Sequence, residues 1–189
     1  MQSRTILQAI RVLSVVLVGG CASTPMTRGD AMAERHAIDA DVDASLGKLY
    51  GQIPGSKELV GKATGVLVFP GIVSAGLVVG ASYGKGEMRS GSRVTGYYSS
   101  AAGSVGLIAG AESRAVFVLF MTQSSYDRFV ASKGWTAGVD ASVAMATLGA
   151  DGSVDTSTAQ PDISGFVLSN GGLMANLSLD GTKISHLDL

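Results

Sequence analysis

Apolar residues in the first third of the chain recur with the period of an α-helix. Their spacings are four, four, three and four residues, which places them on one face of a helix over 31–53. The residues on this face are Ile38, Val42, Leu46, Leu49 and Ile53. Asp30 is a candidate N-cap for this helix, and Pro54-Gly55 is a stop signal. A second, shorter helix is predicted over 56–63.

From residue 63 the period changes to two, which is typical of β-strands. Residues 63–84 carry no charge, which raises the question of a membrane-spanning helix. We reject that helix because Pro70-Gly71 interrupts the segment and because valine and glycine dominate it. We expect Pro70-Gly71 to form a turn between two strands, residues 85–93 to form another turn, and residues 94–121 to supply further strands.

The second half of the chain predicts one more helix and more strands. Residues 122–133 have helical spacing, whereas apolar and polar residues alternate from Trp135 to Met145. Two strands over 163–169 and 173–179 are separated by Asn170-Gly171-Gly172, a composition typical of a hairpin turn. With 26 glycines, the predicted sheet contains many bends. We therefore predict an α+β fold, with N-terminal helices packed on a glycine-rich, strongly curved, barrel-like antiparallel sheet.

The first 20 residues have the organisation of a secretory signal peptide. The positively charged Arg4 and Arg11 precede a short apolar stretch over 12–18, and Gly19-Gly20 leads to Cys21. Residues 18–21 resemble a bacterial lipobox, which implies that Cys21 is acylated and becomes the first residue of the mature chain. An ordinary signal peptide with a chance cysteine is the alternative. We expect an acylated tether over 21–30, one domain over 31–189, and an anchor in the outer membrane that faces the periplasm.

Composition excludes several classes of function. The chain has 14 basic and 15 acidic residues, so its overall charge gives no reason to expect a nucleic-acid partner. A single cysteine excludes a disulfide framework and a cysteine-based zinc cluster, and two histidines leave little room for a multi-histidine metal centre. We expect no metal and no cofactor.

Several segments resemble the SYLF lipid-binding domain family in their order and spacing. They are residues 62–86, 97–113, 116–121, 135–144 and 169–181. The resemblance implies a helical N-terminus on a β-rich body, which binds anionic lipids, including phosphoinositides, through the N-terminal helices and basic residues. It implies a binding protein and not an enzyme. Some eukaryotic members bind actin, but we expect no actin partner for a periplasmic protein.

Basic residues near apolar surface are the candidates for binding lipid headgroups. The two candidate groups are Lys57 with Lys62, and Lys85 with Arg89 and Arg93. Only Glu87 opposes the second group within its segment. The alternative is that all five are solvated surface charges. We predict an envelope lipoprotein that binds anionic phospholipid, and the alternative function is a lipid-tethered structural or protein-interaction module without a lipid ligand.

Two motifs suggest other chemistry but lack the required context. Residues 80–84 match the G-x-S-x-G motif of α/β-hydrolases, and Asp140 or Asp162 and His186 follow Ser82 in the order of a catalytic triad. The chain lacks the alternating β/α pattern of that fold, so we reject a hydrolase.

Alternating aspartates at 39, 41 and 43 resemble the start of a calcium-binding loop. The glycine and the terminal glutamate of that loop are missing, because Ala44 and Tyr50 stand at their positions. We therefore predict an exposed acidic helix face. Asp140 is expected either to bond to the backbone or to line a cavity.

Overall fold

The computed structural model describes most of the chain after the N-terminal segment. The described residues are 27–76, 79–105, 110–148, 152–154, 160–169, 172–174 and 178–189. The predicted signal peptide, Cys21 and most of the predicted tether lie outside these ranges, so their roles remain predictions.

Three helices occur in the described part of the chain, at the places that the apolar spacing predicts. Their bounds are Arg28–Gln52 for α2, Ser56–Lys62 for α3 and Gln123–Ala131 for α4. The first helix begins earlier than predicted because Thr27, and not Asp30, is its N-cap. Asp30 is the third residue of the helix and completes a capping box with Thr27, which satisfies two backbone N–H groups at the helix start.

The strands form one sheet in the order β5-β9-β3-β2-β1-β4-β7-β6, with β8 beside β7. Their bounds are Gly65–Gly76 (β1), Val79–Ser90 (β2), Arg93–Val105 (β3), Gly110–Phe120 (β4), Trp135–Thr136 (β5), Ala144–Met145 (β6), Ile163–Ser169 (β7), Gly172–Leu173 (β8) and Lys183–Leu187 (β9). The first four strands have the spatial order of a Greek key. The sheet is mixed and not purely antiparallel, because β6 runs parallel to β7.

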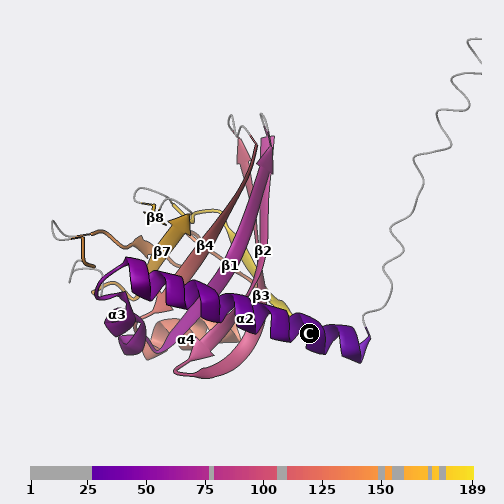
Figure 1. Ribbon diagram of the computed structural model, residues 1–189, viewed down its shortest axis with the longest axis horizontal. Coiled ribbons are helices and arrows are strands. Elements are labelled where there is room, and N and C mark those ends of the chain that lie inside the picture. Colours follow the sequence, from indigo (N-terminus) through magenta and orange to yellow (C-terminus); the bar gives the residue numbers. More distant parts are fainter. Residues whose placement is uncertain are drawn as a thin grey trace, which may run out of the picture.

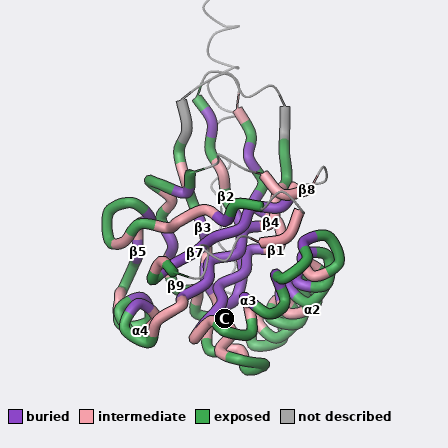
Figure 2. Tube along the Cα trace, turned by 90° about the vertical axis from the view of Figure 1, so that its left-hand side faces the viewer, coloured by how far each residue is buried: buried purple, intermediate pink, exposed green. Residues whose placement is uncertain are grey.

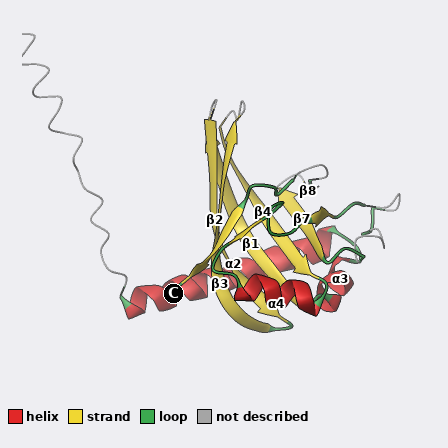
Figure 3. Ribbon diagram, turned by 180° about the vertical axis from the view of Figure 1, so that it is seen from behind, coloured by secondary structure: helices red, strands yellow, loops and turns green. Residues whose placement is uncertain are grey.

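Helices cover both faces of this strongly curved, half-barrel sheet (Figure 1). The helices α2 and α3 lie on one face and α4 lies on the other, which Figure 3 shows from behind. Both faces of β1 are therefore buried over residues 65–69. Val66 and Val68 join the core beneath α2, whereas Leu67 and Phe69 join the core beneath α4. Figure 2 shows the buried positions concentrated in the lower parts of the long strands.

The prediction of a turn at Pro70-Gly71 is wrong, because β1 runs through both residues. The pairing of β1 with its two neighbours shifts register between Val68 and Val73, so the Pro-Gly pair lies at a bulge. Proline has no N–H to donate to a neighbouring strand, and a bulge is one of the few strand positions that tolerates it. The charge-free segment thus forms strands, and no helix in the described residues is long and apolar enough to cross a membrane.

The predicted turn over 85–93 is much shorter in the structure. Residues up to Ser90 belong to β2, and the chain reverses at Gly91-Ser92, where Gly91 has a φ of 60°. Lys85 and Arg89 therefore project from a strand and not from a turn. This change of element decides which partners the two side chains reach.

The predicted strand from Trp135 to Met145 is also largely wrong. Its two ends pair as the short strands β5 and β6, and between them Ala137 and Ala141 form an isolated bridge across a turn in which Gly138 has a φ of 80°. Within this turn Asp140 accepts a 2.6 Å hydrogen bond from the backbone N–H of Thr136. Asp140 thus bonds to the backbone and also lines a small pocket beside Trp135, although it lies in a turn and not on a strand. Val139, expected on the apolar face, is 79% exposed.

Candidate functional site

A groove of about 490 Å³ lies where α2 and α3 meet the sheet. Its apolar lining comes from both helices and from β1, and includes Leu46, Val60, Ala63, Val66 and Val68. Its polar lining includes Tyr50 and Asp43 of α2, Lys57 of α3 and Arg89 of β2. The groove thus combines apolar walls with two of the five basic residues that the sequence singles out.

Sequence spacing explains how the two helices build this groove. Asp43 and Gly47 are four residues apart, as are Leu46 and Tyr50, so these residues lie along one side of α2. Pro54 and Gly55 end that helix, and Gly55, with a φ of 82°, allows the chain to reverse into α3. Lys57 and Val60 of α3 then face the same groove.

Arg89 makes three contacts, two of which connect the sheet to α2. Its Nε donates to Glu87 Oε1, its Nη1 lies 2.6 Å from Asp43 Oδ1, and its Nη2 donates to the backbone oxygen of Asp39 at 3.5 Å. Asp43 has a side chain that is 69% exposed, whereas Glu87 is fully buried. One partner of Arg89 therefore lies in the interior, and the other lies at the solvent-exposed surface.

The buried carboxyl of Glu87 has a strongly perturbed proton affinity. Burial raises its pKa to about 7, and the neighbouring Asp39 adds to this effect, while Arg89 lowers it. The ionised form leaves Oε2 without a hydrogen-bond partner among the described residues. The nearby Asp39 carboxyl favours the protonated form of Glu87.

Asp39 is the second acid of this network and is held in place by a tyrosine. The Tyr97 hydroxyl donates a 2.9 Å hydrogen bond to Asp39 Oδ1. Although burial raises the pKa of Asp39, hydrogen bonds with Glu87 and Tyr97 keep it below its ordinary value. The burial of Tyr97 and its hydrogen bond to Asp39 raise the pKa of Tyr97 to about 12. The acidic helix face is therefore not simply exposed as predicted, because it carries the contacts that hold α2 on the sheet.

The remaining predicted headgroup residues lie outside the groove lining. Lys62 forms a 2.7 Å ion pair with Glu58 on the exposed side of α3, next to Gly61 and Ala63 of the groove. Arg93 is exposed at the start of β3 and directly follows the turn residue Ser92, which lines the groove. Both cations flank the groove in sequence, and neither lines it.

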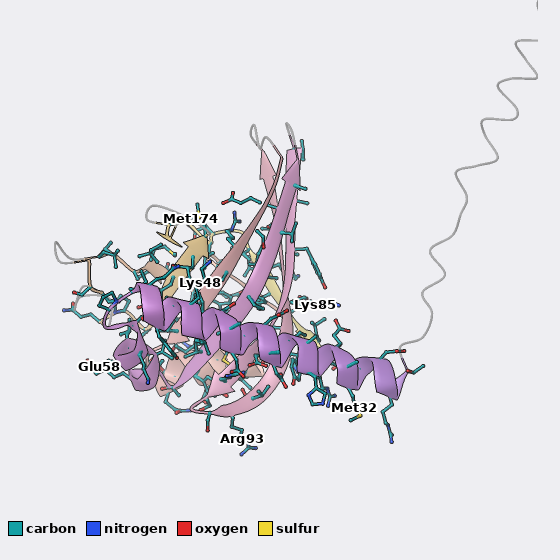
Figure 4. All side chains as sticks on the ribbon, viewed as in Figure 1. Met32, Lys48, Glu58, Lys85, Arg93 and Met174 are labelled. Carbon is teal, nitrogen blue, oxygen red and sulfur yellow. The ribbon has the colours of Figure 1, made fainter. Side chains whose placement is uncertain are left out.

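Lys85 belongs to a different part of the surface. Its ammonium group pairs with Glu34 in the first half of α2, and this hydrogen bond raises the pKa of Lys85. Figure 4 shows Lys85 and Arg93 on opposite sides of α2. The structure therefore divides the second predicted group, because only Arg89 of that group reaches the groove.

Sequence reasoning missed Tyr50, Asp43 and the central position of Glu87. A signal for the network was present, because residues 85, 87 and 89 share one strand face and Asp39 and Asp43 share one helix face. Only the packing of α2 against β2 brings these two faces together.

The rejected hydrolase motif lies in a context that does not suit catalysis. Ser82 lies inside β2, which continues for eight residues to Ser90, and its hydroxyl donates to the backbone oxygen of Ala102 at 3.4 Å. A nucleophile elbow instead requires a sharp turn from a strand into a helix at the serine.

Comparison with known families bears on the C-terminal half of the chain. The family Ysc84, described as "Las17-binding protein actin regulator", matches residues 101–188. No curated protein matches this sequence. The matched range begins in β3, so the groove residues of α2, α3 and β1 precede it. Domains of this family are related to lipid binding or actin regulation and are not known as enzymes. The match agrees with the resemblance that the sequence predicts, because residues 101–188 are similar to this family.

Proposed function

We propose that this protein is an envelope lipoprotein that binds anionic phospholipid in the groove between α2, α3 and the sheet. The observation that carries this proposal is the presence of Lys57 and Arg89 in a groove whose walls are otherwise largely apolar. Acylated Cys21 would hold the domain at the periplasmic face of the outer membrane, where the ligand is abundant. The groove then needs only modest affinity, because the tether keeps its local lipid concentration high.

The headgroup phosphate contacts Lys57 and the Nη1 group of Arg89 in this proposal. The phosphate replaces Asp43 at Arg89, and Asp43 remains hydrated because most of its side chain is already exposed. Guanidinium and ammonium groups form strong, charge-assisted hydrogen bonds with phosphate oxygens. Glu87 stays bonded to Nε and keeps the guanidinium oriented toward the groove.

The lipid's glycerol and upper acyl chains contact the apolar walls. Leu46, Val60 and Val66 supply this surface. A volume of about 490 Å³ falls within the range of roughly 300–1,000 Å³ that is usual for small-molecule sites. The groove therefore accommodates a headgroup with part of one chain, and the rest of the lipid remains in the bilayer.

Vesicle binding by residues 22–189 tests this proposal. The residues of both core clusters lie at position 38 or later, so this chain contains both cores whole, and circular dichroism checks its folding. We expect the chain to sediment with vesicles of phosphatidylglycerol and phosphatidylcholine in preference to phosphatidylcholine alone. The preference should weaken with added salt, because ions screen the exposed Lys57.

Charge reversal at Lys57 provides the specific variant. Lys57→Glu should lower the affinity for phosphatidylglycerol vesicles by about tenfold or more, because each basic residue near an anionic surface contributes ~1 kcal/mol. Lys133→Glu is the matched control, because Lys133 is exposed just after α4 on the opposite face of the sheet. Equal losses of affinity in the two variants would show that the groove is not the binding site. No binding to any vesicle would favour a tethered protein-interaction module.

A further inference from the structure

The ends of β1 to β4 project from the body of the protein as a four-strand arm (Figure 1). We define the arm as residues 72–76, 79–84, 101–105 and 110–113. The flanking strands do not extend along it, because β9 pairs with β3 only as far as Ala101 at the base of the arm and β7 pairs with β4 only over 115–120. In Figure 1, α2 crosses the strands below the arm. The arm is therefore a sheet segment with two faces and two edges beyond the packed body.

The arm exposes large apolar side chains. Val73, Val79 and Tyr83 are 51%, 71% and 49% exposed. Val73 pairs directly with Tyr83, and Ala75 pairs with Ala81 one row nearer the end of the arm, so these side chains share one face. Residues at 79, 81 and 83 alternate onto this same face. The exposed residues thus form one continuous apolar surface and are not scattered.

The two stretches of sequence that supply the outer part of the arm contain no charged residue. Residues 63–84 and 94–111 contain no charged residue, and the first charges that follow them are Lys85 and Glu112. Glu112 pairs with Ser74, which is two residues from the end of β1, or about 7 Å at the usual strand rise of ~3.3 Å per residue. The outermost rows of the arm are therefore uncharged on both faces.

We propose that the arm inserts shallowly into a phospholipid bilayer, with Val79 and Ala81 in its apolar boundary and Tyr83 among the headgroups. A docked protein would need an apolar surface on one face only, whereas lipid surrounds an inserted segment on all sides, and both faces of this arm lack charge in their outer rows. The level of Glu112 limits the depth to about 7 Å, which lies within the ~5–10 Å that is typical of interfacial segments.

The backbone groups at the edges of the arm also limit the depth to which it can insert. Among the strands that the structure describes, none pairs with the outer edges of β3 and β4 in the arm beyond Ala101, and unpaired backbone N–H and C=O groups are costly in hydrocarbon. At shallow depth, water and headgroups satisfy them. Tyrosine is favoured at this level of a membrane. This inference shares the proposed membrane partner with the groove but uses a separate surface.

A single environment-sensitive dye tests the insertion directly. Residues 22–189 contain no cysteine, because the only cysteine of the chain is Cys21. Val79→Cys and the control Val139→Cys each give one labelling site at a highly exposed valine. With vesicles, the dye at 79 should shift to the blue and be quenched by shallow lipid-borne quenchers, while the dye at 139 should remain unchanged. Equal responses, or no response at 79 in sedimenting protein, would overturn the proposal.

Charged variants separate the arm from the groove. Val79→Asp should lower vesicle affinity about tenfold, including affinity for phosphatidylcholine in high salt, whereas Val139→Asp should not. Lys57→Glu should instead remove the salt-sensitive preference for phosphatidylglycerol. If only Lys57→Glu lowers vesicle affinity, the insertion of the arm is contradicted and the groove remains the binding site. If only Val79→Asp lowers it, the groove is contradicted and the arm remains. A blue shift at 79 that rises with protein concentration without vesicles would contradict a lipid partner and indicate pairing of two copies.

Discussion

Replacing Arg89 by methionine should lower the free energy of unfolding by about 3 kcal/mol at pH 8, because it leaves Glu87 buried without the cation that compensates its charge. Arg89 Nε is the hydrogen-bond donor to Glu87, whose side chain is fully buried. Methionine keeps much of the length of the aliphatic stem, so the loss reports mainly on charge. Urea unfolding of both proteins, followed by circular dichroism, measures the difference.

The loss should be smaller at pH 5. Burial raises the pKa of Glu87 from 4.5 to about 7, so the folded protein holds a proton there over a range in which the unfolded chain does not. The stability from this group is fully present below pH 4.5 and is lost as the pH rises through 7, at ~1.4 kcal/mol per pKa unit. At pH 5 the protonated Glu87 no longer requires Arg89, so the variant should recover.

Glu87→Gln provides the complementary variant, because it removes the titrating group. Its free energy of unfolding should be nearly flat between pH 4.5 and 7, where that of the parent protein falls. Glu58→Gln is the control, since Glu58 forms an exposed ion pair on α3. An Arg89→Met loss that is the same at pH 5 and pH 8 would show that Glu87 does not titrate in this range.

Replacing Gly86 by alanine should destabilise the fold by about 3 kcal/mol, because the added methyl group meets backbone and not a flexible side chain. An alanine Cβ at Gly86 would lie 2.0 Å from the carbonyl oxygen of Val68 and 2.8 Å from Phe69 Cδ1. These atoms belong to β1 where it approaches the Pro-Gly bulge, so relief requires the bulged strand to move. Thermal unfolding followed by circular dichroism should show a midpoint lower by about 10 °C.

Gly103→Ala is the matched substitution in a neighbouring strand. No heavy atom lies within 4 Å of the position that its Cβ would take, and the residue is exposed. Its stability should change by less than about 0.5 kcal/mol. Equal effects at Gly86 and Gly103 would show that strand propensity, and not the contact with β1, determines the cost.

The helices were predictable because each carries its own apolar period. Every residue of the predicted apolar face of α2, from Ile38 to Ile53, is buried. The strand ends were less predictable, because Pro70-Gly71 suits either a turn or a bulge. Only the partners on both sides of β1 decide between these, and those partners are distant in sequence.

The site was predictable in its residue types and not in its grouping. Lys57 and Arg89 were both candidates, but the sequence placed them in different groups, and only the packing of α2 and α3 on the sheet joins them in one groove. The interval from Lys85 to Arg93 looked like one basic patch. As a strand followed by a turn, it directs Lys85 to Glu34 and Arg89 to Glu87 and Asp43.

Photocrosslinking with phosphatidylglycerol that carries a reactive group beside its glycerol tests the central claim most directly. Residues 22–189, bound to vesicles and irradiated, should be labelled in peptides that contain 46–50, 57–61 and 66–68. Lys57→Glu should abolish this labelling, whereas Lys133→Glu should leave it unchanged. Labelling of sedimented protein that spares all three groove peptides would contradict a lipid site between α2, α3 and the sheet.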